Sequence, residues 1–154
     1  MTNGNETSTL LEEVTTELQL GAGTVLEGGQ MVDLIEELLR ARAHPDFETL
    51  MVPQEGPPLV YDGIDGFREA WTDWLEPWEE FRFEIEDLIP VDDMLVLLVR
   101  QVATTKRGGV EIATDSGTIW WVVDEQLRRA SFYLDRRAML KAAGLAAPDR
   151  PAGG

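Results

Sequence analysis

The hydrophobic pattern of this 154-residue chain changes its period part-way along, and that change limits the folds open to it. In the first half, apolar residues recur every three or four positions, the spacing of amphipathic helices. From Phe81 onward they alternate with charged residues, as Phe81, Phe83 and Ile85 do, which is typical of a strand with one face in water. Helices followed by long antiparallel strands predict an α+β domain whose helices cover one face of a curved sheet.

Capping and composition signals predict where the ordered domain begins and ends. Thr9 and Glu12 have the spacing of a capping box, so a first helix is expected from about residue 8 and could run as far as Leu26. The end of the chain is rich in Pro, Gly and Ala, which predicts a disordered tail. We therefore expect one domain over 8–145, with disordered segments at 1–7 and 146–154.

Two more helices are expected before the strands. Apolar residues from Met31 to Leu39 form the stripe of a second helix, which should follow the break at Gly28 and Gly29 and end near Arg42. A third helix should begin at the N-cap Asp65 and end at Pro77. Its aromatic residues share one face: Phe67, Trp71, Trp74 and Trp78. Such a stripe is more typical of core than of a ligand site.

The second half predicts a meander of strands and a closing helix. The turns are expected at Lys106–Gly109 and Asp124–Gln126. The strands that these turns connect are expected at 94–105, 110–123 and 127–134. They follow the strand that begins at Phe81, and a short strand is expected earlier, over 47–52. Arg136 to Ala143 should form a short helix that ends at Gly144.

Composition and charge exclude several functions. The chain has no cysteine and one histidine, which excludes disulfides, thiolate catalysis and cysteine-based zinc sites, and we predict neither a cofactor nor a metal. The formal net charge of −16 should repel nucleic acid and anionic lipid, so neither nucleic acid nor membrane is expected as a partner. No signal peptide or membrane-spanning run is apparent, and the expected location is cytoplasmic.

Four segments resemble a known family in their order and spacing. They are "YDGIDGFREAW" (61–71), "WEEFRFEIEDLI" (78–89), "LVLLVRQ" (95–101) and "IWWVVDEQLRRASFYLDRRAMLKAAGL" (119–145). Together they resemble the SnoaL-like branch of the NTF2-like superfamily. The resemblance implies a cone of N-terminal helices on a curved antiparallel sheet with a short C-terminal helix, commonly in a homodimer. The family hosts polyketide cyclases, ketosteroid isomerase-like enzymes, dehydratases, epoxide hydrolases and members of unknown activity.

The resemblance also singles out positions for catalysis. In the cyclase branch an acidic residue before the last helix works with a histidine on the preceding strand; Asp135 matches the acid, and Trp120 occupies the partner position. In the isomerase-like branch the position of the general base falls on Met51 or Val52. Neither branch's set of proton-carrying residues is therefore complete in this sequence.

Three residues are candidates for acid or base chemistry. Asp135 is either the N-cap of the last helix or a proton carrier, and the sequence allows both. Tyr133 belongs to a polar row with Arg129, Ser131 and Asp135, which could point into the cone or into solvent. His44, at the end of the second predicted helix, is the third candidate, although such histidines are usually solvated or bound to helix carbonyls.

The residues predicted to line a substrate pocket combine aromatic and polar side chains. They are Trp71, Trp74, Arg100, Asp115, Trp120 and Ser131. Arg100 could instead form a cross-strand ion pair with Asp115.

Two functions are consistent with these features. The first is a hydrophobic pocket for a small, cyclic, hydrophobic molecule, with or without cofactor-independent acid/base catalysis. The alternative is a non-catalytic dimeric interaction or structural module whose cone is packed by its own aromatic residues. A homodimer is expected through the outer face of the sheet, because the strands carry apolar residues on both faces.

Overall fold

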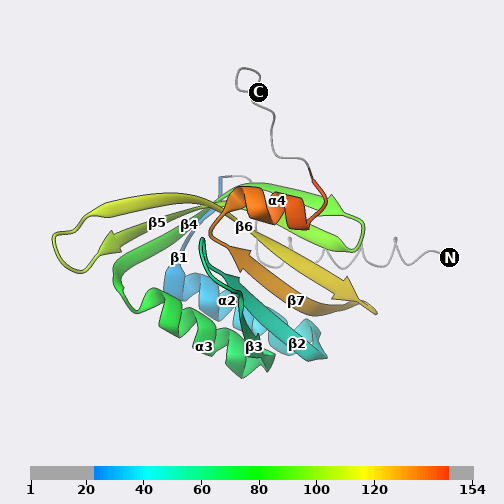
Figure 1. The fold of residues 1–154 in the computed structure, drawn as a ribbon. Helices are drawn as coiled ribbons and strands as arrows, with labels where there is room; N and C mark the ends of the chain where they lie inside the picture. Colours follow the sequence, from blue (N-terminus) through cyan, green and yellow to red (C-terminus); the bar gives the residue numbers. More distant parts are fainter. Residues whose placement is uncertain (1–22, 146–154) are drawn as a thin grey trace, which may run out of the picture.

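The computed structural model describes residues 23–145, which form one curved sheet with helices on both faces (Figure 1). Along the chain the elements are β1 (Val25–Glu27), α2 (Gly28–Arg42), β2 (Ala43–Val52), β3 (Leu59–Asp62), α3 (Gly63–Leu75), β4 (Trp78–Val91), β5 (Met94–Thr105), β6 (Glu111–Val123), β7 (Gln126–Tyr133) and α4 (Arg136–Ala142). The predicted α+β class with a short C-terminal helix is confirmed. The segments predicted to be disordered, 1–7 and 146–154, and most of the first predicted helix lie outside the described residues.

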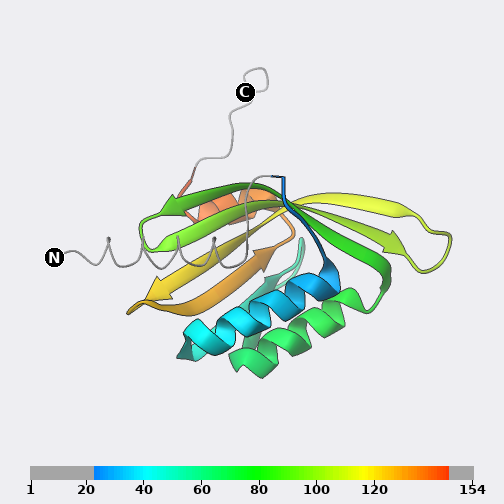
Figure 2. The same ribbon diagram turned by 180° about the vertical axis from the view of Figure 1, so that it is seen from behind.

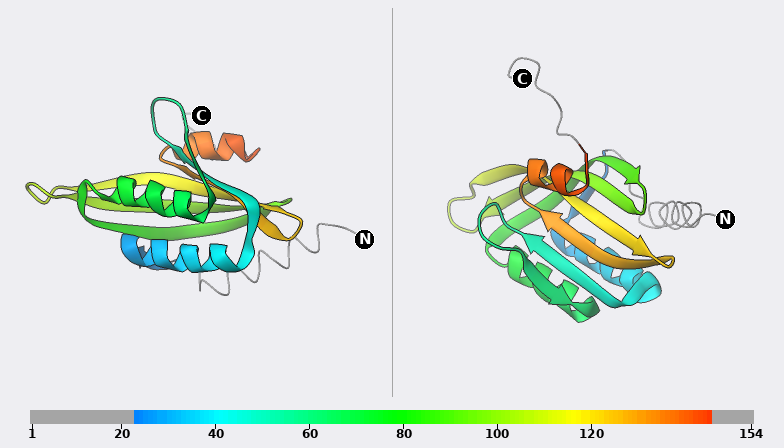
Figure 3. Two further views of the ribbon diagram at one scale, coloured as in Figure 1. Left: turned by 90° about the horizontal axis from the view of Figure 1, so that it is seen from below. Right: turned by 45° about the vertical axis from the view of Figure 1, so that its right-hand side comes forward.

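The sheet has seven strands in the order β1-β4-β5-β6-β7-β2-β3. All neighbours are antiparallel except β2 and β7, which run parallel, so the sheet is mixed rather than purely antiparallel. Helices α2 and α3 lie side by side on one face (Figure 2). Helix α4 lies on the other face, as the view from below shows (Figure 3). The sheet is therefore covered from both sides.

The start of α2 differs from the prediction. Val25 to Glu27 form strand β1, in which Leu26 pairs with Phe83 of β4, so the first helix does not extend to Leu26. Gly28 begins α2 instead of breaking the pattern, and the backbone N–H of Glu27 donates to Gln30 Oε1. Pairing with β4 decides the conformation here, because the local spacing of apolar residues fits either structure.

The start of α3 also differs from the prediction. The helix begins at Gly63 (φ +73°), and Asp65 lies in its first turn rather than at the N-cap. Gly66 packs against the backbone of Tyr61 so closely that a Cβ would lie 2.9 Å from the Tyr61 carbonyl carbon. This close packing carries the chain directly from β3 into the helix, one turn earlier than the capping signal indicated. Trp78, predicted on the helix face, is the first residue of β4.

The two core clusters lie on opposite faces of the sheet. The larger fills the space between the sheet and the helices α2 and α3, where Trp71 and Phe67 are fully buried. The smaller lies under α4, where Met139 and Leu140 pack on Val96 and Ile119. The predicted strand 94–105 matches β5, and the turn at 106–109 is present. The predicted strand at 47–52 begins earlier, at Ala43, as β2.

Candidate ligand cavity

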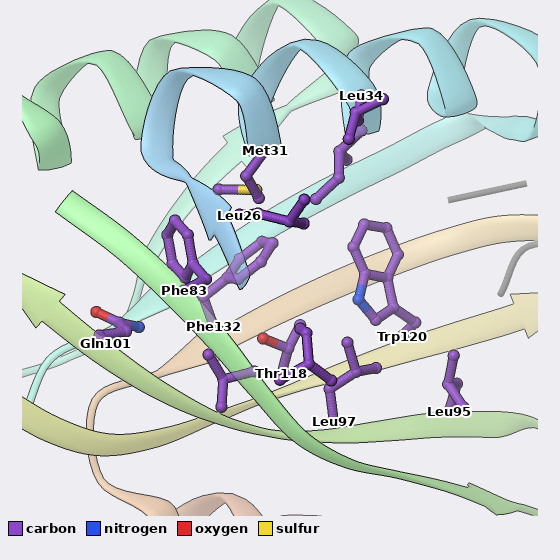
Figure 4. Close-up of a pocket in the computed structure, with 13 residues that line it drawn as sticks. Leu26, Met31, Leu34, Phe83, Leu95, Leu97, Gln101, Thr118, Trp120 and Phe132 are labelled. Carbon is purple, nitrogen blue, oxygen red and sulfur yellow. The ribbon is translucent and has the colours of Figure 1, made fainter. Parts of the chain in front are cut away.

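A narrow cavity of about 50 Å³ lies between α2 and the middle of the sheet (Figure 4). Its lining residues are Leu26, Met31, Leu34, Ile35, Phe83, Ile85, Leu95, Leu97, Val99, Gln101, Thr118, Trp120 and Phe132. A volume of this size has room for about three or four water molecules. It can hold a small compound, whereas most sites for drug-sized ligands are several times larger.

Strand alternation decides which side chains reach the cavity. Successive residues of a strand point to opposite faces. On β5, Leu97, Val99 and Gln101 therefore face the helices together. Directly opposite residues on the neighbouring strands share that face, so Thr118 beside Leu97 and Phe83 beside Gln101 line the same space.

The polar atoms of the cavity form no hydrogen bond with the residues that the structure describes. The side chains of Gln101 and Thr118 are each 7% exposed, and neither forms a hydrogen bond to the described residues. The indole of Trp120 is equally buried, and its nitrogen lies on the side of the ring nearer Thr118 (Figure 4). None of these three groups is among the fully enclosed unpaired polar atoms of the described residues, so their polar atoms are open to the cavity space. These three groups are therefore suited to hydrogen-bonding a ligand.

No ionisable side chain lines the cavity. Among the residues that the structure describes, the lining includes no acid, base, histidine or tyrosine. General acid/base catalysis requires such a group within hydrogen-bonding reach of the substrate. The cavity can bind and orient a molecule, but its described lining cannot transfer a proton by a charged side chain.

Aromatic packing fills the space beside the cavity, under α3. The Trp71 ring lies edge-on to Phe132 and Phe83, with centroid distances of 5.0 Å and 5.3 Å. Trp120 lies edge-on to Phe132 at 6.0 Å, so the packed aromatic cluster continues into the cavity wall. The cone is thus solid under α3 and hollow under α2.

A second hollow lies beside the C-terminal end of α3. This aromatic groove has a volume of about 330 Å³ and is lined by Asp73, Trp74, Pro77, Trp78, Phe81, Gln101, Ala103, Ile112, Thr114 and Leu134. Gln101 lines both the groove and the cavity.

Comparison with known proteins identifies the family. The sequence profile of the SnoaL-like domain matches residues 29–130, which is more than half of the 154 residues. The chain belongs to the SnoaL-like family. The matched region begins in α2 and ends within β7, so it leaves out β1 and the last three residues of β7, which include the cavity residue Phe132. No curated protein matches the sequence.

Solved structures share the fold of this SnoaL-like protein. A protein from Jannaschia sp. CCS1, assigned to the SnoaL-like polyketide cyclases, has a TM-score of 0.60 at 13% identity, with 95% of each chain covered. TerC co-crystallised with polyporic acid has a TM-score of 0.58 at 18% identity, covering 88% of this chain and 98% of that chain. An NTF2-like protein of unknown function from Burkholderia pseudomallei K96243 has a TM-score of 0.55 at 13% identity, covering 88% of this chain and 95% of that chain. At these identities the likeness establishes the fold alone.

The predicted pocket residues of the SnoaL-like protein divide between several places. Trp120 lines the cavity, and Trp74 lines the aromatic groove. Trp71 is fully buried in the core, as is usual for a tryptophan stripe on a helix. Arg100 and Asp115 are exposed and lie directly opposite each other on β5 and β6, in the predicted cross-strand register.

The polar row of β7 points away from the cavity: Arg129 and Asp135 reach solvent, as one alternative expected, whereas Ser131 and Tyr133 pack on the side of α4. Phe132 faces the cavity, so Ser131 and Tyr133 face the side that carries α4. Ser131 is fully buried there, and its hydroxyl has no hydrogen-bond partner among the described residues. Tyr133 packs in the cluster under α4, where burial raises the pKa of its phenol and the charge of Arg129 partly lowers it.

The other two catalytic candidates also lie away from the cavity lining. Asp135 caps α4: its Oδ1 accepts from the backbone N–H groups of Arg137 at 3.0 Å and Ala138 at 3.4 Å. The predicted cap is confirmed, and a proton-transfer role for this exposed carboxylate stays a prediction. His44 lies at the start of β2, where its Nδ1 accepts from the backbone N–H of Asp46 at 3.0 Å. A catalytic role for His44 also stays a prediction.

Of the two polar strand residues in the cavity, the sequence pattern had suggested only Thr118, as part of a polar stretch with Asp115 and Ser116 near the cavity mouth; Gln101 was missed. Gln101 and Thr118 are the polar side chains of the cavity. The alternation of β5 contained a signal for Gln101, because it follows Leu95, Leu97 and Val99 at intervals of two. Among residues 23–145, no three histidine, aspartate or glutamate side chains converge as a metal site, and no helix is long and apolar enough to cross a bilayer.

Proposed function

We propose that this SnoaL-like chain binds a small, neutral, hydrophobic molecule in the cavity between α2 and the sheet. The observation that carries the proposal is the lining itself, which is apolar except for three uncharged hydrogen-bonding groups, on Gln101, Thr118 and Trp120. A charged ligand would lose its hydration there without gaining a counter-charge, which is strongly unfavourable. A neutral molecule with one or two polar atoms fits this environment.

Binding is favoured over catalysis for the same reason. The described lining supplies no proton carrier, and Asp135, Tyr133 and His44 lie elsewhere. TerC, which has the same fold, was co-crystallised with polyporic acid. That complex supports the idea that a protein of this fold can bind a small organic molecule.

A pair of substitutions on neighbouring residues tests the proposal. Leu97 faces the cavity, and Leu98, the next residue of β5, faces the other side of the sheet. Leu97→Phe should fill the cavity and abolish binding of small neutral compounds such as 1-butanol and 1-pentanol, measured by calorimetry and by thermal shift. Leu98→Phe should leave binding intact. Equal binding by both variants, or no binding by the parent protein, would contradict the proposal.

A second candidate function is a dimeric interaction module. It is favoured by the solid packing of Trp71 under α3 and by the small volume of the cavity. The expectation that the outer face of the sheet is bare needs correction, because α4 packs on Val96 and Ile119 there. Dimer formation stays a proposal. Light scattering at micromolar concentration tests it, and a stable monomer mass would remove this candidate.

A further inference from the structure

The cavity and the aromatic groove share one wall, the side chain of Gln101. On β4, Phe83 lines the cavity and Phe81 lines the groove. On β5, Val99 lines the cavity and Ala103 lines the groove, with Gln101 between them. Gln101 lies at one end of the cavity residues, beyond Thr118 (Figure 4). The two hollows therefore follow one another along the same face of the same strands, with Gln101 between them.

The Gln101 amide is a polar group on an otherwise apolar face of β5. Its side chain is 7% exposed, and its two N–H donors and its carbonyl oxygen form no hydrogen bond with the described residues. The neighbouring inward positions, Val99 and Ala103, carry apolar side chains. The amide atoms are not among the fully enclosed unpaired atoms of the described residues, so they are open to the two hollows and can hydrogen-bond a ligand there.

Resting on the function proposed above, we propose that the cavity and the groove form one elongated site in which Gln101 sets the length of the ligand. The cavity of about 50 Å³ is too small for most ligands, whereas the groove adds about 330 Å³. The ligand class is a neutral, elongated, mainly apolar molecule that carries a hydrogen-bonding group where it meets Gln101. Short molecules stay within the cavity, and longer ones meet the Gln101 side chain.

A ladder of linear alcohols from 1-butanol to 1-decanol tests this role by calorimetric titration. Each additional methylene of the alcohol that becomes buried should tighten binding about fourfold, until the alkyl chain reaches Gln101 and the affinity stops rising. The alkyl length at which the affinity stops rising is called the cut-off. Gln101→Ala should remove the side chain that separates the cavity from the groove, so that the affinity continues to rise with longer alcohols. Two further buried methylenes would make the longest bound alcohol roughly 15-fold tighter than in the parent protein.

Two further variants separate the wall from other effects. Gln101→Leu keeps a side chain of similar size without the amide, and it should keep the cut-off of the parent protein. Adding Ile112→Trp to Gln101→Ala should fill the groove and return the cut-off to the parent's length, since Ile112 lines the groove and is 44% exposed. Circular dichroism checks folding, and Gln101→Ser replaces Gln101→Ala should the alanine variant not fold.

The possible results distinguish the two proposals. If short alcohols bind and Leu97→Phe abolishes their binding, but Gln101→Ala leaves the cut-off unchanged, the role of Gln101 is overturned and the binding function stands. If Gln101→Leu lengthens the cut-off as much as Gln101→Ala does, the proposal that the bulk of residue 101 limits the ligand length is overturned. Failure of every alcohol to bind the parent protein overturns both proposals.

Discussion

The Oδ1 atom of Asp135 lies 3.0 Å from the backbone nitrogen of Arg137 and accepts its hydrogen bond at the start of α4. Asparagine can accept the same bond, whereas alanine cannot. We expect Asp135→Asn to leave the free energy of unfolding nearly unchanged and Asp135→Ala to lower it by about 1 kcal/mol in urea denaturation. Loss of ligand binding or of a measurable turnover in a stably folded Asp135→Asn would indicate that the ionised carboxylate has a second role.

Gly117 is expected to tolerate no side chain, because α4 crosses β6 at this point. A Cβ at Gly117 would lie 2.1 Å from Met139 Cε and 3.0 Å from the backbone oxygen of Leu97. Gly117→Ala should therefore lower the free energy of unfolding by about 1–3 kcal/mol. The matched control is Gly29→Ala in α2, where the nearest atom to the new Cβ would be 3.6 Å away and no loss is expected. Similar melting temperatures for the two variants would contradict this account.

Arg136 joins α4 to the sheet through three acceptors. Its guanidinium donates to the backbone oxygens of Ser116 and Val99 and to the carboxylate of Glu86. Arg136→Ala leaves both carbonyls without this donor, and we expect a loss of about 1–3 kcal/mol in the free energy of unfolding. Arg137→Ala, at the exposed neighbouring position, should change stability by less than about 0.5 kcal/mol. The prediction is wrong if chemical denaturation shows equal losses.

Tyr133 should make the protein less stable at alkaline pH. Burial raises the pKa of its phenol in the folded state, so folding favours the neutral form. This contribution is complete below the usual tyrosine pKa of about 10 and is lost as the pH rises through the raised value. Tyr133→Phe should reduce the alkaline loss of stability. The chain has two tyrosines, so the phenolate absorbance titration of the parent protein minus that of Tyr133→Phe gives the titration of Tyr133 alone. A midpoint of this difference at or below about pH 10 would contradict the prediction.

Arg129 offers a second check on the environment of Tyr133. Its guanidinium forms an ion pair with Glu48 across the parallel β2–β7 pair, and its charge lowers the pKa of Tyr133. Arg129→Gln removes that charge, so the Tyr133 titration should move further upward. The absorbance titration of this variant measures the shift directly, and an unchanged midpoint would show that the Arg129 charge is screened by solvent or by Glu48.

Local signals in the sequence were sufficient for most of the elements. The alternation that begins at Phe81, the turn at 106–109 and the Asp135 cap each depend on residues close together in the chain, and the structure contains all three. The resemblance carried by the segments from Tyr61 to Leu145 identified the family and the α+β cone. Val25–Glu27 departed from the prediction because its conformation depends on pairing with β4, which lies far along the chain.

The site itself was decided by tertiary structure. Both faces of β5 are apolar, with Leu95, Leu97 and Val99 on one and Val96 and Leu98 on the other, so the sequence determined the alternation but not which set faces the helices. Packing of α2 and α3 on one face and α4 on the other made that choice. It placed Phe132 in the cavity and Ser131 behind it, and it turned Gln101 inward and Arg100 outward. A strand's pattern has a period of two with two equivalent phases, and only the elements that cover the sheet distinguish them.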